Sequence, residues 1–351
     1  MFKMANEINK TTAFQNNFEI WETVLDDYII GINWNYKSNL VAVLTSTGRF
    51  AIFNHSAKAK QYAIKAHAIG AIRLGISPTE NKAVTTGQDG LAKLWNLENG
   101  QLINEVRMNA LWVEHITWSP NGNYYAIGAG NAIKVFNNKG ALIQEYNLHE
   151  STVSGIEWRS DSQAFATACY GGVRLFEIEQ EIPFQFLEWK NSMLSLSWSL
   201  DDKFICCGTQ DSRVHFFPIP YSQGSDFEMS GYRGKVKILE WSFDSKYFLT
   251  NCWDEMVVWE VSGVAPMGQQ PIILLGHKAK ITSAKFQSNN AVLASGDETG
   301  LLLFYDLTIS DKAITGVNLE TEISALNWSN DNNFLAIGTA NGEVIIMEFS
   351  S

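Results

Sequence analysis

The chain has 351 residues, 46% of them hydrophobic and 12% aromatic, which is enough apolar material for a large core. Its 37 acidic residues outnumber its 26 basic ones, and the net charge of -11 disfavours binding to nucleic-acid phosphates or anionic lipid. No apolar run approaches the roughly 18 residues of a membrane helix, and residues 1–17 do not resemble a secretion signal. We therefore expect a cytoplasmic protein without a nucleic-acid or membrane partner.

The first predicted elements are an arm and a strand. Residues 1–17 are polar and rich in Asn and Thr, which predicts a flexible N-terminal arm. The alternating segment Phe18–Val24, with the sequence FEIWETV, predicts a strand, and a second strand is expected at Ile29–Trp34.

From Ile29 onward the chain repeats a unit of 40 to 45 residues. Each unit contains four alternating segments separated by polar turns, as in residues 113–148. A unit of this length is typical of one four-stranded propeller blade, which cannot bury both its faces without neighbours. One apolar anchor marks the end of the first strand in every unit: Trp34, Ile76, Trp118, Trp158, Trp198, Trp241, Phe286 and Trp328.

The last unit begins at Ile323 and supplies only three strands. The segment Phe18–Val24 can provide the fourth, which would close the ring and remove an exposed strand edge. The sequence therefore predicts an all-β fold, a closed β-propeller of four-stranded antiparallel blades. Residues 18–351 are expected to form this single domain, with eight blades.

Several turns resemble those of WD-repeat (WD40) β-propeller proteins. In the second unit His67 precedes the inner strand, and Trp95-Asn96 stands where the family has Trp-Asp. Gly276-His277 and Tyr305-Asp306 repeat these signatures in the seventh unit. The resemblance extends from about Phe18 to Phe349. Seven is the commoner number of blades in this family, so seven blades is the alternative, in which the weak first unit is not a blade.

The resemblance also implies a buried hydrogen-bond network of His, Ser or Thr, Asp and Trp within a blade. The complete set is predicted once, as His67, Thr86, Asp89 and Trp95, whereas Thr299 stands at the Asp position of the seventh unit. Such a set could suggest a hydrolase, but its spacing matches the structural network. Neither a P-loop nor an HExxH motif is present. We therefore predict no catalytic residue, no cofactor and no enzyme activity.

The four cysteines fall in or next to predicted strands, where small apolar residues pack. They are Cys169, Cys206, Cys207 and Cys252. No C-x-x-C pair and no histidines at metal spacing occur, so reduced structural thiols and no metal site are expected.

WD-repeat propellers typically act as platforms for partner proteins, and the resemblance implies the same for this chain. The usual docking site is the upper face, formed by the loops before the inner strands and the turns between the second and third strands. Large amphipathic side chains there favour an interaction patch, although tryptophans could instead pack between blades. The candidate residues are Trp112, Glu114, Tyr170, Trp189, Tyr232, Arg233, Lys235, Lys237 and Trp253, with Trp112 and Trp253 the strongest.

This interpretation predicts a monomeric, non-enzymatic scaffold for a protein partner. The longer lower-face connections, residues 218–226 and 261–271, are expected to be neutral insertions.

An alternative function follows from a looser resemblance to bacterial WD-repeat proteins encoded beside metallochaperone GTPases. The segments that carry it are residues 111–122, 165–176 and 229–250. It implies an accessory role in zinc homeostasis, in which the propeller docks such a GTPase or a client metalloprotein. His115 and Cys169 would then be transient metal ligands, unless both are packed.

Overall fold

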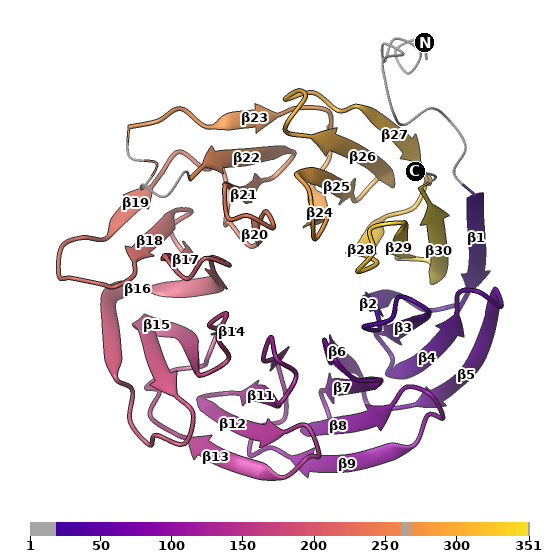
Figure 1. Ribbon diagram of the computed structural model, residues 1–351, viewed down its shortest axis with the longest axis horizontal. Coiled ribbons are helices and arrows are strands. Elements are labelled where there is room, and N and C mark those ends of the chain that lie inside the picture. Colours follow the sequence, from indigo (N-terminus) through magenta and orange to yellow (C-terminus); the bar gives the residue numbers. More distant parts are fainter. Residues whose placement is uncertain (1–18, 262–265, 267, 350–351) are drawn as a thin grey trace.

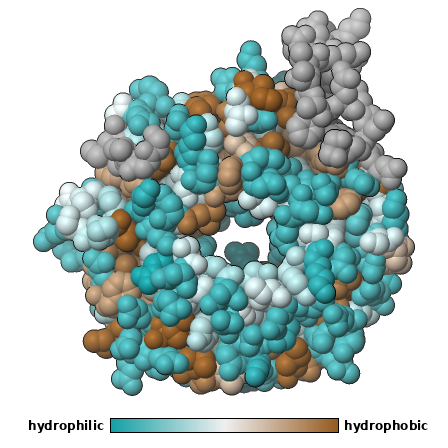
Figure 2. Space-filling view, in the orientation of Figure 1, coloured by the Kyte–Doolittle hydropathy of each residue, from teal (hydrophilic) through white to brown (hydrophobic). Residues whose placement is uncertain are grey.

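The computed structural model describes residues 19–261, 266 and 268–349, and all regular elements in these residues are β-strands. The strands form a ring around a central opening (Figures 1 and 2). Since the described residues contain no helix, none there could cross a membrane as a helix. The arm predicted for residues 1–17 lies outside the described residues.

The strands in chain order are β1 Glu19–Val24, β2 Ile29–Trp34, β3 Leu40–Thr45, β4 Arg49–Asn54, β5 Ala59–Lys65, β6 Ala71–Ile76, β7 Lys82–Gly87, β8 Leu91–Asn96, β9 Leu102–Arg107, β10 His115–Trp118, β11 Tyr124–Ala129, β12 Ala132–Asn137, β13 Leu142–Tyr146, β14 Gly155–Trp158, β15 Ala164–Glu177, β16 Gln185–Trp198, β17 Phe204–Thr209, β18 Val214–Pro218, β19 Phe227–Met229, β20 Leu239–Trp241, β21 Tyr247–Cys252, β22 Glu255–Glu260, β23 Ile272–Leu274, β24 Ile281–Phe286, β25 Val292–Asp297, β26 Leu301–Asp306, β27 Thr315–Asn318, β28 Ile323–Trp328, β29 Phe334–Thr339 and β30 Glu343–Glu348.

The described strands form seven antiparallel sheets, six of four strands and one of six strands, β14 to β19. Counted as hydrogen-bonded sheets, the propeller has seven blades instead of eight, which is the alternative number, although the first unit does form a blade, β2 to β5. The reason is strand continuity. β16 pairs with β15 up to Ser192 and with β17 from Met193 onward, so the fourth and fifth repeat units share one sheet. All eight anchors nevertheless end inner-strand segments.

The N-terminal strand closes the ring, as predicted. β1 pairs antiparallel with β30, in register from Glu19 opposite Glu348 to Val24 opposite Glu343. The sheet order β1-β30-β29-β28 confirms that the first strand completes the last blade (Figure 1). The Trp21 ring also meets Phe53 of β4 edge to face, with 5.6 Å between ring centroids, which ties the last blade to the first.

The core lies between neighbouring blades, where the repeat anchors pack. Seven of the eight anchors are at most 9% exposed, and Ile76 is partly buried. Burying each such side chain contributes about 1.5–3 kcal/mol. Some anchors also join blades by hydrogen bonds: the indole N–H of Trp158 donates to Thr117 O, and that of Trp328 to Lys285 O. The 40-to-45-residue period is therefore the period of inter-blade packing.

Candidate functional site

The predicted network of the second unit is present with one change of residue. The His67 ring is fully buried and lies between Asp89, 3.0 Å from Nδ1, and Thr85, whose Oγ1 is 2.9 Å from Nε2. The indole N–H of Trp95 also donates to Thr85 Oγ1. The hydroxyl is thus Thr85 and not the predicted Thr86, because adjacent strand residues point to opposite faces. Thr86 Oγ1 is buried without a partner.

A second network occurs in the seventh unit, where the sequence predicted an incomplete one. His277 contacts Asp297 through Nδ1 and Ser295 through Nε2, each at 2.8 Å. Asp297 supplies the carboxylate of this network, so no Asp is missing and Thr299 does not replace one. Thr299 instead donates its hydroxyl to Asp297.

Tyr232 takes the place of the histidine in the sixth unit. Its hydroxyl lies 2.9 Å from Thr250 Oγ1 and accepts from the indole N–H of Trp259. Tyr232 and Thr250 are 18 residues apart, the separation that also joins His67 to Thr85 and His277 to Ser295. Tyr232, predicted as a surface contact, is therefore a partly buried member of a blade network. The shared 18-residue spacing was the signal that sequence reasoning missed.

These networks are built to hold blades together. Burial lowers the pKa of His67 and of His277, although the neighbouring aspartates act in the opposite direction, so both imidazoles are neutral near pH 7. Polar groups buried in this way stabilise a fold because they satisfy one another. This arrangement supports the structural role predicted for the His–Thr–Asp set.

The upper face carries exposed aromatic side chains. Trp112 is 57% exposed, Tyr170 58% and Trp253 58%, so none of the three is packed between blades. Trp112 lies in the loop before β10 and Trp253 in the turn between β21 and β22, whereas Tyr170 lies within β15 where its pairing with β16 shifts register. Other apolar side chains exposed in loops of this face are Ile69, Leu111, Leu148 and Leu275.

The charged candidates lie in the same units as Trp112 and Trp253. Arg233 and Lys237 are exposed, and Glu114 is partly exposed. The Arg233 guanidinium lies 3.5 Å from the Glu255 carboxylate across the turn that carries Trp253. Lys235 is exposed as well.

Trp253 has an unusual backbone for a bulky residue. It is the first residue of the two-residue turn between β21 and β22 and has a φ of 60°. The matching turn of the third unit, between β11 and β12, has Gly130 at that position with a φ of 57°. Two-residue hairpin turns favour glycine where φ is positive, because other residues strain the backbone there. A tryptophan at this position is therefore disfavoured twice, by the positive φ of the backbone and by the exposure of a large apolar ring to water.

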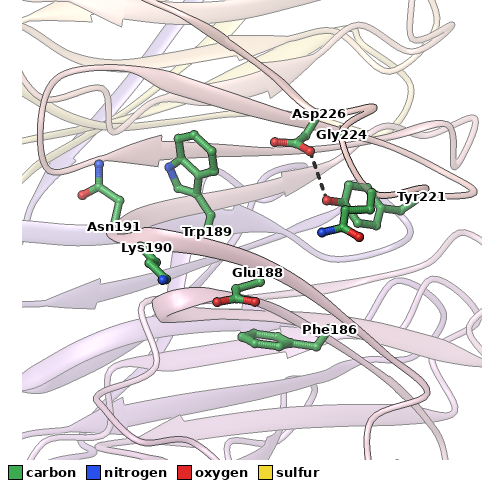
Figure 3. Close-up of a pocket in the computed structure, with 9 residues that line it drawn as sticks. Phe186, Glu188, Trp189, Lys190, Asn191, Tyr221, Gly224 and Asp226 are labelled. Atoms are coloured by element: carbon green, nitrogen blue, oxygen red, sulfur yellow. Dashed lines mark hydrogen bonds between the residues drawn. The ribbon is translucent and has the colours of Figure 1, made fainter.

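Trp189 lies on the side of the ring instead of the upper face. Its indole stacks on His215, with ring centroids 3.9 Å apart, and it borders an open pocket of about 730 Å³ (Figure 3). The pocket is lined by Phe186, Glu188, Trp189, Lys190, Asn191, Tyr221, Gln223, Gly224 and Asp226. We call this the lateral pocket. Sequence reasoning missed it because four of its nine lining residues come from the connection 218–226, which was expected to be neutral.

The two residues considered as metal ligands are held by other contacts. His115 Nε2 lies 3.0 Å from Val153 O, and burial lowers the pKa of His115 to about 4. Cys169 is buried, and its Sγ accepts a hydrogen bond from Arg174 Nη1. Within the described ranges, no group of three or more His, Cys, Asp or Glu side chains is arranged to hold a metal ion. The role in zinc homeostasis stays a prediction.

Comparison with known families gives a match to the WD domain, G-beta repeat, over residues 268–306, which is the seventh unit. The protein is a β-propeller whose seventh unit matches the WD repeat. A solved structure of the computationally designed Ika8 protein superposes with a TM-score of 0.78, covering 93% of this chain and 98% of that one at 18% identity. At this identity the likeness shows the fold alone.

Curated relatives of this propeller are distant. The guanine nucleotide-binding protein subunit beta of Oryza sativa subsp. indica is 22% identical over 315 residues, which cover 82% of each chain. Actin-interacting protein 1 of Caenorhabditis elegans is 20% identical over 336 residues, 92% of this chain but only 46% of that protein. The propeller thus spans less than half the length of the second relative.

Proposed function

We propose that this WD-repeat propeller is a non-enzymatic platform that docks a partner protein on its upper face. The observation that carries the proposal is Trp253, which is 58% exposed on a turn whose φ of 60° suits glycine. A residue that is unfavourable both for the backbone and for hydration is retained where it serves a contact.

The surroundings of Trp253 support a protein contact. Tryptophan, tyrosine and arginine dominate the binding energy of protein interfaces, and the upper face exposes Trp112, Tyr170 and Arg233 as well. The net charge of -11 supports a protein as partner over a nucleic acid. We further propose that the chain is monomeric and cytoplasmic.

The distant relatives support the same class of function. By their names, one is a subunit of a guanine nucleotide-binding protein and the other interacts with actin. Each description fits a propeller that works by contact with other proteins, and the identity of the partner here is open to experiment.

Affinity capture with the intact protein tests this function. Proteins captured from the host lysate are compared for the wild type, the double variant Trp112→Ala/Trp253→Ala and the control Leu102→Ala. Leu102 is 46% exposed but lies on the outer strand β9, away from the upper face. A partner bound by the wild type and the control is expected to lose at least ten-fold in affinity for the double variant, measured with the purified partner.

The free energy of unfolding of the double variant is also expected to equal that of the wild type to within about 1 kcal/mol, because both side chains are largely exposed. Capture that is equal for all three proteins, or a large loss of stability in the double variant, would refute an upper-face docking site.

A further inference from the structure

The lateral pocket lies across the outer edge of β16. Figure 3 shows Trp189, Tyr221 and Asp226 on one side of this strand, and Glu188 and Phe186 on the other. The segment Gln185–Trp189 pairs with β15 along its inner edge. Among the described residues no strand pairs with its outer edge. The pocket therefore combines side-chain walls with a strand edge whose backbone groups are open to a ligand.

Asp226 gives the pocket a fixed negative charge. One carboxylate oxygen accepts a hydrogen bond from the Tyr221 hydroxyl at 3.0 Å, and the other lies 3.0 Å from His215 Nε2. His215 is 1% exposed, and burial lowers its pKa although Asp226 raises it, so the imidazole is neutral near pH 7. Two neutral donors orient the carboxylate without cancelling its charge. A carboxylate held in this way suits a cationic ligand.

Aromatic rings stand beside this carboxylate. His215 stacks on Trp189 and holds the indole in place beside Asp226. The pocket wall already shows this kind of contact, because the Arg174 guanidinium lies over the Phe186 ring, 4.6 Å from its centroid. Cations bind over aromatic faces, and a nearby carboxylate strengthens the attraction.

The charges around the pocket favour a cation too. Among the lining residues Glu188 and Asp226 are acidic and Lys190 is basic, and the nearby Arg174 guanidinium already contacts the Phe186 ring and Cys169 Sγ. Leading into the pocket, Ile182 and Phe184 lie just before β16 and are 70% and 49% exposed, and Phe186 on the strand is 43% exposed. The side of the strand that carries Phe186 also carries Glu188, and the other side carries Trp189 with Tyr221 and Asp226.

We propose that the lateral pocket binds a lysine or arginine side chain carried by an extended segment of a partner protein. The segment lies along the outer edge of Gln185–Trp189, with its cation between Trp189 and Asp226 and its alternate apolar side chains toward Phe184 and Phe186. Strand addition of this kind takes affinity from main-chain hydrogen bonds and specificity from alternate side chains. This proposal rests on the proposed function in one respect, namely that the ligand is a protein. The lateral pocket itself is separate from the upper-face tryptophans.

Peptide titration tests the proposal. The probes are acetyl-Val-Arg-Val-Arg-Val-amide, the same peptide with lysine for arginine, and the same peptide with citrulline, a neutral analogue of arginine. Binding to the full chain is followed through the indole ¹H–¹⁵N signal of Trp189, assigned with the Trp189→Phe variant. We expect the arginine or the lysine peptide to shift this signal, and the citrulline peptide to bind at least ten-fold more weakly.

Charge-removing variants locate the site. Asp226→Asn and Glu188→Gln should each weaken binding of the cationic peptide several-fold, whereas Asp311→Asn, an exposed carboxylate of the seventh unit, should leave it unchanged. Glu188 is exposed, so its variant keeps the test valid if Asp226→Asn disturbs the fold. Equal binding of citrulline and arginine peptides, equal weakening by Asp311→Asn, or no Trp189 shift at millimolar peptide would overturn the proposal. Upper-face variants should leave peptide binding intact, which separates this result from that of partner capture.

Discussion

Trp253 and Gly130 occupy the same turn position in two units, so the free-energy cost of the tryptophan's backbone can be measured. Three variants suffice: Trp253→Ala, Trp253→Gly and Gly130→Ala. Both Trp253 variants remove the same exposed side chain, and they differ only in whether the residue has a Cβ atom at a φ of 60°. A Cβ added to Gly130 would meet only Ala110 Cβ, at an ordinary contact distance of 3.5 Å. Its cost would thus come from backbone conformation.

A non-glycine residue in the left-handed region costs roughly 1–2 kcal/mol, and glycine loses about 0.5–1 kcal/mol through the entropy of the unfolded chain. We expect Trp253→Gly to be more stable than Trp253→Ala by about 1 kcal/mol, and Gly130→Ala to be less stable than the wild type by a similar amount. The assay is equilibrium unfolding in guanidinium chloride at constant slope. Equal midpoints for Trp253→Gly and Trp253→Ala would show that the turn is unstrained, and the main argument for a contact role of Trp253 would fail.

Three further predictions concern the networks, Glu157 of β14 and the closing strand. Thr85→Val should lower the free energy of unfolding by about 2–4 kcal/mol, because it leaves the buried His67 Nε2 acceptor and the buried Trp95 indole donor unpaired, whereas Thr86→Val should be neutral or stabilising; urea denaturation of both variants checks this. Burial raises the pKa of Glu157 to about 7, with Lys285 opposing and Glu240 adding to the shift, so the folded state binds more protons than the unfolded chain between about pH 4.5 and 7. Stability should therefore fall as pH rises through this window, by at most about 3 kcal/mol, and Glu157→Gln should remove this component; a pH series that is identical for variant and wild type would contradict it. Deleting residues 1–24 should open the edge of β30 and cause concentration-dependent association in light scattering, unlike deletion of residues 1–17 alone.

The architecture could be predicted because its signals are local and repeated. Strand alternation, polar turns and the anchor spacing each recur along the chain, and counting strands in the last unit was enough to assign Phe18–Val24 to the closing blade. The sheet count could not be predicted in this way. Whether β16 continues from one unit to the next depends on backbone hydrogen bonds that the side-chain period does not encode.

Two predicted network residues were misplaced by one or two positions in the sequence. The lateral pocket was missed because its residues come from segments that are distant in sequence. Thr85 and Thr86 are both threonines, and only the register of β7 decides which faces Trp95. The lateral pocket brings Trp189 together with Tyr221 and Asp226, from a connection that begins some thirty residues later, and no local pattern marks that meeting. Trp112 and Trp253 could be recognised as unusual because each breaks a polar turn.

The pairing of β1 with β30 has a consequence for synthesis of the chain. Some 320 residues separate the two strands, so at translation rates of about 5–20 residues per second β1 waits roughly 15–65 s for its partner. Ile20 and Val24 of this strand stay about half exposed even in the finished ring, and during the wait the rest of the strand is uncovered as well. Glu22 is exposed in the middle of the strand, and its charge disfavours premature pairing of β1 with another nascent chain. β1 is thus synthesised long before β30, the strand that encloses it.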